Sequence, residues 1–452
     1  MDNIVALATF PSSTSALNII RISGDSSKDI VEKIFSSSSL PLRHRTICYG
    51  DIVNPSNKSK VDDVILLPYF APKTFTGEDL FEIICHGGNL IYKQIISLVI
   101  AEGARFAETG EFTKRAYINK KIDLSQAEAI NDIINSENDI ALELARKNLD
   151  GVLGKEVAEL KELFIGFLSE IETSINFPED EVVAVSSEKL NKLLSSLQRF
   201  LDSSAFQEDI NIEDVLILGE PNVGKSSLLN KLADQEKSIV TDISGTTRDL
   251  IEHHIDISGI KLNLVDTAGL NKDSTDVVEG IGIKKALDRL KTAHTVLYML
   301  DATVPFCSDN FKLFYSEHLE NISATVIFLI NKTENESGPD LSFLKSRHTI
   351  ISISVKQGLN IDKVRESLLS SIDEYSEEVL SKSFFLNMRQ RELLEKSIAL
   401  VAEAKDLCDA GETEEVIAGL IHAALLYVER IVGNVSDEEL LESIFSNFCI
   451  GK

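Results

Sequence analysis

The residues best suited to chemistry lie at positions 219–226, where the sequence reads GEPNVGKS. This spacing matches G-x-x-x-x-G-K-[ST], a loop whose glycines let backbone N–H groups surround phosphate. An apolar run precedes the loop and a helix-forming stretch follows it, so the helix start adds its positive end. We expect Lys225 to contact the β- and γ-phosphates and Ser226 to ligate Mg²⁺. The alternative is a glycine-rich turn that only resembles such a loop, and the strand–helix context argues against it.

Two further polar motifs each follow an apolar run that reads as a strand, and a third, Ser354 to Lys356, ends the last such run. Asp266 follows residues 262–265, where its carboxylate suits the outer coordination shell of Mg²⁺ and the Gly269 N–H suits the γ-phosphate. Asn331 follows residues 326–330, where a base could be read. In order and spacing these motifs resemble those of P-loop GTPases. The expected nucleotide contacts from the whole set are Asn222, Val223, Gly224, Lys225, Ser226, Ser227, Asp266, Thr267, Ala268, Gly269, Asn331, Lys332, Glu334, Ser354 and Lys356.

Two positions depart from the usual GTPase pattern. The base-reading motif is usually N-K-x-D, and Glu334 stands where the aspartate is expected. Glutamate can accept the same pair of hydrogen bonds from guanine, although its extra methylene moves the carboxylate by roughly 1.5 Å. We expect guanine preference to survive; the alternative is that Glu334 is simply a loop acid. Leu270 occupies the place of the glutamine that orients water in Ras-type enzymes, so another polar group must do so.

The composition limits what the chain can be. Its 452 residues suggest about three domains, and 43% hydrophobic residues are enough to bury cores, which excludes disorder over most of the length. The 45 Lys and Arg against 72 Asp and Glu leave a net charge of −27. Since so acidic a surface repels polyanions, nucleic acid must meet a local basic patch or arrive on a second protein.

The cysteines and the apolar segments indicate the compartment. Five cysteines, an odd number without C-x-x-C spacing, argue against a disulfide framework and against a zinc site. The N-terminus carries an acid and no cationic segment, and the longest apolar stretch, residues 416–428, is too short to cross a bilayer. We therefore expect a cytoplasmic protein without membrane contact.

Hydrophobic periodicity predicts three kinds of region. Residues 1–118 mix turns with short strands, which is typical of an α+β domain; the strands are expected at 19–22, 64–67 and 80–85. Helices are expected from near residue 122, with Ser125 and Glu128 as a capping-box pair, and near residue 438, with Ser436 and Glu439 as another. Further helical periodicity occurs at 157–175, 190–201 and 417–431.

Between the helical regions, short apolar runs alternate with helical segments, which predicts a mainly parallel sheet. These runs lie at 215–218, 262–265, 296–300, 326–330 and 350–355. The fold class is therefore multidomain, with an α/β P-loop GTPase domain inserted into an α-helical domain that follows an N-terminal α+β domain. The predicted boundaries are 1–118 for the α+β domain, 119–210 and 377–452 for the helical domain, and 211–376 for the GTPase domain.

Beyond these motifs, the sequence resembles one family over nearly its whole length, the tRNA-modification GTPases called MnmE or TrmE. The signs are TGED at 76–79, HGG at 86–88, GEF at 110–112, KIDLSQAEA at 121–129, TDISGTTRD at 241–249 and the terminal CIGK at 449–452. Many GTPases share the nucleotide motifs. A terminal C-x-G-K beside an inserted GTPase domain is nearly diagnostic.

The resemblance implies an N-terminal folate-binding domain that also forms a constitutive homodimer. It further implies a flavin-dependent partner, MnmG, in a heterotetramer-type complex that installs an aminomethyl or carboxymethylaminomethyl group at C5 of the wobble uridine of certain tRNAs. A tetrahydrofolate derivative, in its 5,10-methylene or 5-formyl form, supplies the one-carbon unit. GTP hydrolysis drives dimerisation of the GTPase domains. Because this chain is acidic, we expect the partner to make most contacts with tRNA.

The resemblance also assigns roles residue by residue. The segment Thr241, Asp242, Ile243, Ser244, Gly245, Thr246 and Thr247 would contact the nucleotide, with Thr247 joining Ser226 at Mg²⁺. The K⁺ ligands would be Asn222, Thr241, Ile243 and Thr246. A cation there can replace an arginine finger, because it places positive charge where negative charge develops. Glu279, which alone reads as a solvated helix-start acid, matches the family's water-orienting glutamate.

Four residues match the family's folate site: Arg21, Glu78, Lys121 and Lys452. Cations suit the glutamate carboxylates of a folate and a carboxylate suits donors on its pterin ring, whereas alone each residue reads as a surface ion. The family's glycine-rich stretch after the first strand is replaced here by FPSSTSA at 10–16. Cys449 matches a cysteine important to the modification reaction, its alternative being an incidental thiol in a mobile tail.

The leading interpretation is a K⁺-stimulated GTPase that acts as the regulated half of a tRNA-uridine modifying complex. One alternative is a GTP-binding switch in ribosome or RNP assembly, which leaves the α+β domain and the terminal motif without a role and expects a basic RNA-binding appendage. Another is a scaffold that binds nucleotide without turnover, supported by Glu334 and by the altered stretch at 10–16.

Overall fold

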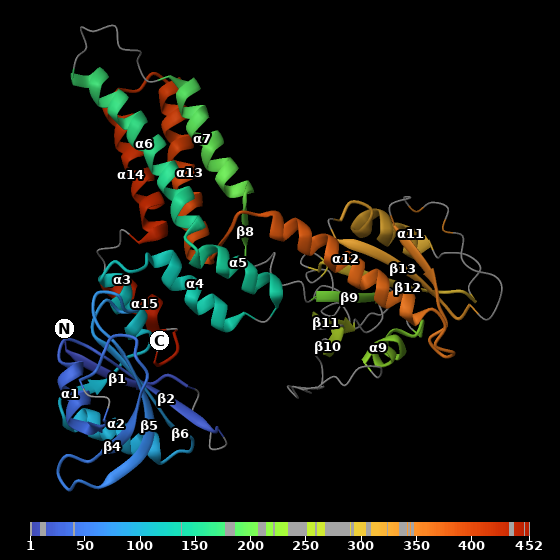
Figure 1. The fold of residues 1–452 in the computed structure, drawn as a ribbon. Helices are drawn as coiled ribbons and strands as arrows, with labels where there is room; N and C mark the ends of the chain where they lie inside the picture. The colour runs from blue at the N-terminus through green and yellow to red at the C-terminus, as the bar shows by residue number, and fades with distance from the viewer. Residues whose placement is uncertain are drawn as a thin grey trace, which may run out of the picture. The chain divides into compact units, whose positions relative to one another are not determined.

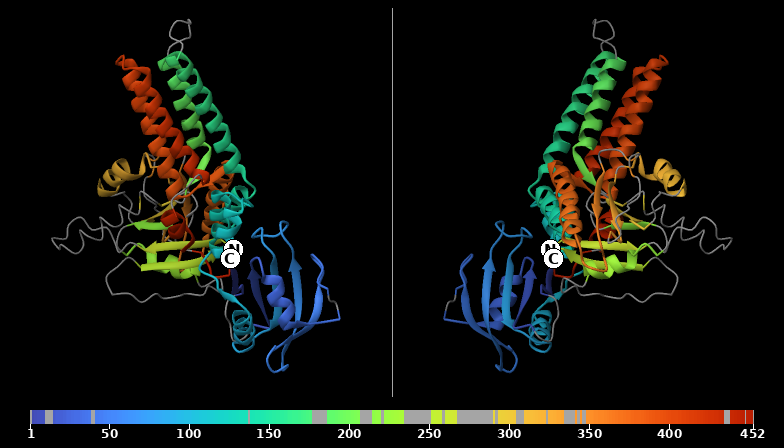
Figure 2. Two further views of the ribbon diagram at one scale, coloured as in Figure 1. Left: turned by 90° about the vertical axis from the view of Figure 1, so that its left-hand side faces the viewer. Right: turned by 90° about the vertical axis from the view of Figure 1, so that its right-hand side faces the viewer.

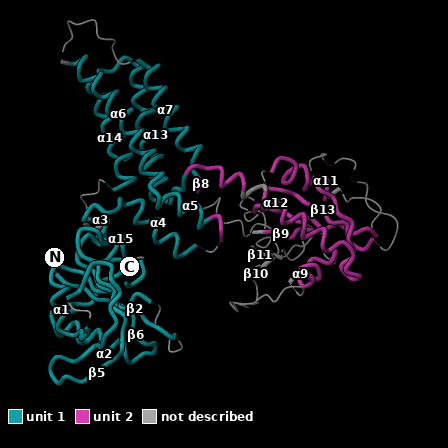
Figure 3. The backbone as a smooth tube through the Cα atoms, in the orientation of Figure 1, with its two compact units in different colours: residues 1–137, 141–204, 384–452 teal, residues 138–140, 205–383 magenta. Residues whose placement is uncertain are grey.

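A computed structural model describes residues 2–9, 15–38, 41–136, 138–176, 186–206, 214–219, 222–233, 251–257, 260–266, 290, 293–303, 309–322, 324–333, 341, 344, 348–433, 438–446 and 448–451. The chain folds into two compact units, shown in Figure 3. The first comprises Met1–Glu137, Ala141–Ser204 and Phe384–Lys452, and the second comprises Asn138–Ile140 and Ala205–Ser383. Among the described residues, no helix is long and apolar enough to cross a membrane.

The first unit begins with a seven-stranded sheet and two helices (Figure 1). Its elements are β1 (Asn3–Leu7), β2 (Leu17–Ser23), α1 (Ser27–Ile34), β3 (Phe35–Ser36), β4 (Cys48–Val53), β5 (Lys60–Tyr69), β6 (Leu80–His86), α2 (Ile91–Ala101) and β7 (Ala104–Phe106). The strand order is β3-β4-β5-β6-β2-β1-β7, and β1 pairs with β7 in parallel while β2 pairs antiparallel with β1 and β6. The strands predicted at 19–22, 64–67 and 80–85 are confirmed.

Alternation along these strands gives the sheet two different faces. Ile20, Ile22 and Ile83 are fully buried in a core shared with α1 and α2. Arg21 lies between Ile20 and Ile22, Glu82 directly precedes Ile83, and the two are paired across β2 and β6. They therefore project from the opposite face, and this face bears the pocket described below.

Helices from both sides of the GTPase segment form one bundle. The elements of the chain on either side of that segment are α3 (Glu111–Ile118), α4 (Leu124–Asn135), α5 (Asp139–Leu149), α6 (Val152–Asn176), α7 (Ser187–Asp202), β8 (Ser204–Phe206), β15 (Phe384–Leu386), α13 (Met388–Asp409), α14 (Glu414–Val432) and α15 (Glu438–Ser446). The helix α13 packs on α14 and α7, and α14 packs on α6, so the helices coloured green and red lie side by side in Figures 1 and 2. An interrupted helical domain is thereby confirmed.

The apolar spacing explains why these helices pack. In α7, the buried residues Leu190, Leu193, Leu197 and Phe200 recur at helical spacing along one stripe. In α14, the buried set is Ile417, Ile421, Ala424, Leu425, Val428 and Ile431. Each stripe requires a partner surface, and segments distant in the sequence provide it.

The start of α4 differs from the prediction. We expected Ser125 and Glu128 to form the capping box, but Asp123 is the cap: its carboxylate accepts from the Gln126 N–H at 2.8 Å, and the Gln126 side chain accepts from the Asp123 N–H at 3.0 Å. Two capping patterns overlap here: D-x-x-Q at Asp123 and Gln126, and S-x-x-E at Ser125 and Glu128. Aspartate is as good a helix cap as serine. The prediction was wrong because Glu128 is engaged elsewhere, by Arg389. The second pair, at Ser436 and Glu439, includes a residue outside the described ranges.

The second unit contains a six-stranded sheet in the order β10-β11-β9-β12-β13-β14. Its elements are β9 (Asp214–Gly219), α9 (Lys225–Ala233), β10 (Ile251–Ile257), β11 (Ile260–Asp266), β12 (Thr295–Asp301), α11 (Asp309–Phe314), the π-helix η1 (Tyr315–Leu319), β13 (Thr325–Asn331), β14 (Thr349–Ser352) and α12 (Ile361–Ser381). Every neighbouring pair from β11 to β14 is parallel, which confirms the predicted α/β class.

Two details of this sheet were not predicted correctly. The strand β10 was missed; it pairs antiparallel with β11 at the edge of the sheet. The last strand was expected to reach residue 355 but ends at Ser352, because Ser354 turns to pair with Leu359. Both lie where the sheet meets loops, where apolar periodicity is weak.

Ion pairs join the first residues of the N-terminal domain to its last helix. Arg115 on α3 is only 4% exposed and donates to Glu78 at 3.1 Å, to Glu111 at 2.8 Å and to Asp2 at 2.6 Å. Arg105 donates to Glu111 at 2.6 Å. Burial alone would raise the pKa of Glu111, but the hydrogen bonds from the two guanidinium groups outweigh it and hold this pKa below its ordinary value.

We expect this cluster to make the N-terminal domain sensitive to acid. Because the pKa of Glu111 is lower in the folded state than in the unfolded state, its stabilisation is complete above about pH 4.5 and is lost as the pH falls through the folded-state value. The hydrogen-exchange protection factors of the α3 amides, which are corrected for the pH dependence of intrinsic exchange, should fall in this window. Glu111→Gln should flatten the acid response, whereas the exposed control Glu412→Gln should retain it. An unchanged acid response in the first variant would contradict the assignment.

Candidate functional site

The phosphate-binding loop joins β9 to α9, as the sequence predicts. At Gly219, with φ of +147°, an added Cβ would lie 2.5 Å from the Met299 carbonyl oxygen, so only glycine fits this crossing. At Gly224, with φ of +106°, an added Cβ would lie 2.7 Å from Asn331 Nδ2. Lys225 is buried, and its ammonium donates to the Gly219 carbonyl at 2.9 Å. The backbone cradle that phosphate requires is therefore formed around two glycines without side-chain obstruction.

The motif residues meet at one edge of the parallel sheet. Asp266 ends β11 beside Ile217 of β9, and Asn331 ends β13 beside Asp301 of β12. Because the carboxyl ends of parallel strands meet at one edge, ligands of such sheets bind there. The fold thus brings the phosphate loop, Asp266 and Asn331 to the same edge, although side-chain contacts of Asp266 lie outside the described part.

Asn331 ties three of these segments together. Its Nδ2 donates to the Val223 carbonyl at 2.8 Å, and its Oδ1 accepts from the Val355 N–H at 3.0 Å. It is buried, so both bonds are shielded from water. The side chain that the sequence suggested as a base reader therefore fastens the phosphate loop to the turn after β14, where Ser354 and Lys356 stand.

The neighbouring Lys332 is also fixed. It has φ of +67° and pairs with Asp301 at 2.6 Å. Burial alone would raise the pKa of Asp301, but the hydrogen bond from Lys332 and the nearby Thr303 outweigh it and lower this pKa. The predicted residues 241–247, 267–269, Glu279 and Glu334 lie outside the described residues.

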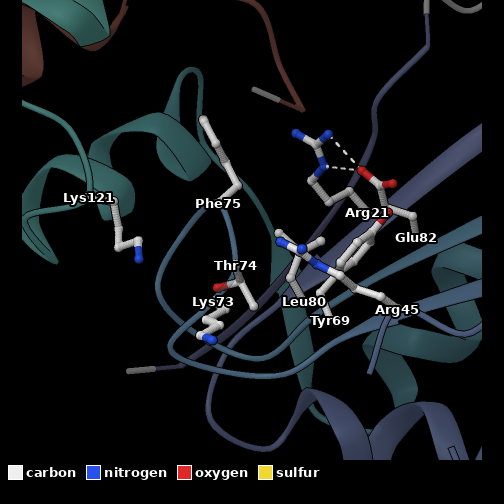
Figure 4. A pocket seen from close by; sticks show the side chains of 9 residues that line it. All are labelled: Arg21, Arg45, Tyr69, Lys73, Thr74, Phe75, Leu80, Glu82 and Lys121. Carbon is white, nitrogen blue, oxygen red and sulfur yellow. Dashed lines mark hydrogen bonds and ion pairs between the residues drawn. The ribbon is translucent and has the colours of Figure 1, made fainter. Parts of the chain in front are cut away.

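A second candidate site is a pocket of about 540 Å³ on the N-terminal sheet, shown in Figure 4. Strand residues form its floor, and its rim comes from the loop before β4, the loop before β6 and the segment before α4 (Figure 4). The lining residues are Arg21, Arg45, Tyr69, Lys73, Thr74, Phe75, Leu80, Glu82 and Lys121. Its volume suits a small-molecule ligand.

The pocket is cationic although the chain is acidic. Arg21, Arg45, Lys73 and Lys121 face a single carboxylate, Glu82, whereas the whole chain carries −27. Arg21 is already paired with Glu82 at 2.8 Å, so the other three cations set the local potential. Such a local patch attracts a small anion. A long polyanion would extend beyond the patch and be repelled by the negative charge of the rest of the chain.

The rim of the pocket is anchored from α3 and from the segment before α4. Lys121 donates to the Pro72 carbonyl at 2.9 Å, and Asn119 donates to the Thr76 carbonyl at 2.7 Å. Glu78 lies behind this loop, 7% exposed, where Arg115 and Ser23 donate to its carboxylate. Of the four predicted folate residues, the fold therefore brings Arg21 and Lys121 together in the pocket. Glu78 is engaged elsewhere, and Lys452 lies outside the described residues.

The sequence did not point to several pocket residues. Glu82 could have been found, because β2 and β6 read as neighbouring strands and an Arg facing a Glu across them is a favourable pair. Arg45, Lys73 and Phe75 come from loops with no motif. Only the tertiary fold places them on one rim.

The C-terminal tail is docked on the N-terminal domain beside this pocket. Ile450 pairs with Thr109, and the Cys449 carbonyl accepts from the Gly110 N–H at 3.4 Å. The Gly451 carbonyl accepts from Arg21 at 3.3 Å. At Gly451, with φ of +90°, a Cβ would lie 2.4 Å from the Leu7 carbonyl oxygen. The tail thus lies against a pocket residue, and its Cys449 is exposed.

Comparisons with known proteins indicate the family to which the chain belongs. The chain matches the families described as MnmE helical domain, over residues 124–449, and GTP-binding protein TrmE N-terminus, over residues 3–121. It is 37% identical over 465 residues to the tRNA modification GTPase MnmE of Acetivibrio thermocellus, covering 100% of this chain and 99% of that protein. The protein of that name from Thermotoga sp. (strain RQ2) is 37% identical over 462 residues, covering 100% of both. The solved structure of Aquifex aeolicus Era bound to GDP.AlF4⁻ is 28% identical, with a TM-score of 0.29, and covers 35% of this chain and 56% of that one.

Gly224→Ala should weaken GTP binding. The new side chain would meet Asn331 in a backbone conformation that costs about 1–3 kcal/mol for an L-residue, which corresponds to about tenfold in affinity or more. Titration with a fluorescent GTP analogue measures the effect. Gly419→Ala, in α14, is the matched control, since nothing lies within 4 Å of its added Cβ. Equal affinity of both variants would show that the loop does not have the geometry described.

Proposed function

Because the chain belongs to the MnmE family of tRNA modification GTPases, we propose that its GTP hydrolysis serves the addition of an aminomethyl or carboxymethylaminomethyl group at C5 of a tRNA wobble uridine. The protein is a GTP hydrolase by family. One observation carries the rest of the proposal: the C-terminal tail is docked against Arg21, which brings the Cys449 segment to a cation-rich pocket.

We assign the parts of the chain to separate tasks. Residues 1–118 bind the one-carbon donor and mediate dimerisation, residues 119–210 and 377–452 form the helical domain, and residues 211–376 bind and hydrolyse GTP. Two covalent connections join the last part to the helical domain. A conformational change in the GTPase domain can therefore be transmitted to the helical domain along the chain.

In the GTPase domain, Lys225 would bind the β- and γ-phosphates, and Ser226 and Thr247 would hold Mg²⁺. Asn222 is exposed at the loop, so its carboxamide is accessible to a K⁺ ion, which Thr241, Ile243 and Thr246 would complete. These cations supply positive charge where the transition state becomes more negative. Glu279 would orient the attacking water.

The N-terminal pocket fits a tetrahydrofolate derivative. Arg45, Lys73 and Lys121 suit the carboxylates of its glutamate tail, and Tyr69, Phe75 and Leu80 suit its rings. When bound, such a donor supplies a one-carbon unit. The pocket's carboxylate, Glu82, takes the role that the sequence suggested for Glu78, that of accepting from ring N–H groups, in competition with Arg21.

The same sheet face supports a homodimer. Tyr49 on β4 and Ile65 on β5 are paired across the strands and are 65% and 38% exposed. Ile47 precedes them and is 68% exposed. Apolar side chains gathered on an open sheet face favour association, and a second copy is the partner that the family implies. The acidic surface favours MnmG, the flavoprotein partner, as the main binder of tRNA.

The alternative of a GTP-binding switch for RNA assembly explains only the second unit. It gives no task to the cationic pocket or to the docked tail. It also expects an extended basic surface, whereas the cations of the pocket form a patch suited to a small anion. We therefore favour the modification function.

The cation mechanism predicts that hydrolysis is faster in KCl than in NaCl at equal ionic strength. Glu279→Ala should slow turnover by about a hundredfold or more, while the affinity for GTP changes little, because the residue is proposed to act on water. Lys225→Ala should instead weaken binding itself. Steady-state rates and nucleotide titrations separate the two effects. Equal rates in the two salts would exclude the K⁺ role.

The pocket assignment predicts that Lys121→Ala and Arg45→Ala each weaken binding of 5-formyltetrahydrofolate by about tenfold, by loss of a charge-assisted contact. Isothermal titration measures this. Cys449→Ser should retain that binding and the GTPase rate but lose wobble-uridine modification, detected by mass analysis of tRNA nucleosides. Full modification by the serine variant would exclude a chemical role for the thiol. If neither Lys121→Ala nor Arg45→Ala weakens folate binding, the pocket is not the folate site.

A further inference from the structure

The helix α4 contacts three parts of the first unit. The segment that precedes it carries Lys121, which lines the pocket. One face of α4 packs against the tail, and another contacts α13, which begins where the chain returns from the second unit. We propose that Glu128 on α4 and Arg389 on α13, here called the latch, position the C-terminal tail and Cys449 and make their position depend on the returning chain. This inference rests on the proposed coupling of GTP hydrolysis to modification.

The returning chain is fastened to α5 before it reaches the latch. Asn148 accepts from the Phe385 N–H at 3.2 Å and donates to the Phe385 carbonyl at 2.8 Å. Asn387 then caps α13 in a capping box with Gln390. Within six residues of returning, the backbone is thus held at defined points, so a displacement of this segment must act on α4 and α5 directly.

The latch itself is bidentate and largely buried. Arg389 Nε and Nη2 donate to the two Glu128 carboxylate oxygens, each at 2.8 Å, and Gln390 adds a third hydrogen bond at 2.7 Å. Glu128 is 8% exposed. The planar fork matches the carboxylate and fixes the orientation of α13 against α4. Separating the pair would leave an unpaired charge in a buried site, which is strongly unfavourable. We therefore expect α4 and α13 to move together.

Arg389 also holds the end of α14. Its guanidinium donates to the Arg430 carbonyl at 2.9 Å and to the Ile431 carbonyl at 3.1 Å. Tyr117 of α3 donates to the Gly433 carbonyl just beyond. A lysine has three N–H donors on a single atom, so it cannot replace the four hydrogen bonds that the planar fork of Arg389 makes. The end of α14 is therefore anchored by Arg389 and, just beyond it, by Tyr117.

The opposite contact of α4 reaches the tail. Leu124 and Ala127 are fully buried against Phe445 and Phe448. Phe448 directly precedes Cys449, whose carbonyl is bonded to Gly110. A shift of α4 therefore displaces the thiol, and the same helix carries the latch one residue after Ala127. The geometry makes Glu128 and Arg389 positioning residues for Cys449.

The test measures the reactivity of Cys449 in the full-length protein. Iodoacetamide labelling, quantified by peptide mass spectrometry, is compared in GDP and in GDP with aluminium fluoride and KCl. In the wild type we expect the labelling rate to differ between these states. Glu128→Gln and Arg389→Lys should label faster and equally in both states, keep the GTPase rate, and lose wobble-uridine modification by about tenfold or more. A purely structural role would not remove the dependence on nucleotide.

Two controls make the result specific. Lys161→Gln removes another ion pair of the bundle, to Glu429 at 2.5 Å, and should behave as the wild type does. Phe448→Leu leaves the latch intact, disturbs the contact of α4 with the tail, and should reproduce the loss even if a latch variant folds poorly. Nucleotide-dependent labelling retained in the latch variants, or absent from the wild type, overturns the inference. Full modification by Cys449→Ser would instead overturn only the proposed chemistry of the thiol.

Discussion

The hydrogen bond from Arg21 to the Gly451 carbonyl is the constraint on which the first unit's functional arrangement depends. Arg21 is placed by the antiparallel pairing of β2 with β6, and two of its N–H groups are used on Glu82. A third nitrogen, Nη1, donates to the Gly451 carbonyl at 3.3 Å. Phe75 and Phe112 lie within 6 Å of the guanidinium, measured to the ring centroids, and hold it in place. One side chain therefore joins the pocket to the terminal motif.

This constraint explains why the helical domain is split in sequence. The tail can reach Arg21 only if α15 is held against α3 and α4, and α15 follows α13 and α14. Those helices in turn need α6 and α7, which precede the GTPase segment, to cover their apolar stripes. Both halves of the helical domain are thus required to hold the terminal motif. A domain inserted between them is connected at both ends to the same bundle.

The sequence was sufficient for features that local spacing encodes and insufficient for those that tertiary contacts create. The phosphate loop, the parallel strands and the helices of the bundle follow from residue periodicity, since each needs only its neighbours in sequence. The cap of α4 could not be predicted in this way, because two overlapping capping patterns compete locally. The choice between them depends on Arg389, far along the chain, which pairs with Glu128. For the same reason, only two of the four residues predicted for the folate site line the pocket. Arg21 lies in a predicted strand and Lys121 in a family motif, whereas Arg45 and Lys73 come from loops that only the fold brings together.

The strength of the tail's contacts fits a protein that couples hydrolysis to a separate reaction. In the function proposed above, GTP is hydrolysed at the phosphate loop and the modification involves the terminal thiol, so hydrolysis would act by changing the position of that thiol. The polar contacts of the tail, at 3.3 and 3.4 Å, are at the long end of the hydrogen-bond range, and much of its anchoring comes from Phe448. A segment held in this way opens at low free-energy cost compared with the core beneath it. In contrast, the bidentate pair of Glu128 and Arg389 is short and buried. A rigid link that ends in a weakly held segment is the arrangement that turns a small displacement of the returning chain into a movement of Cys449.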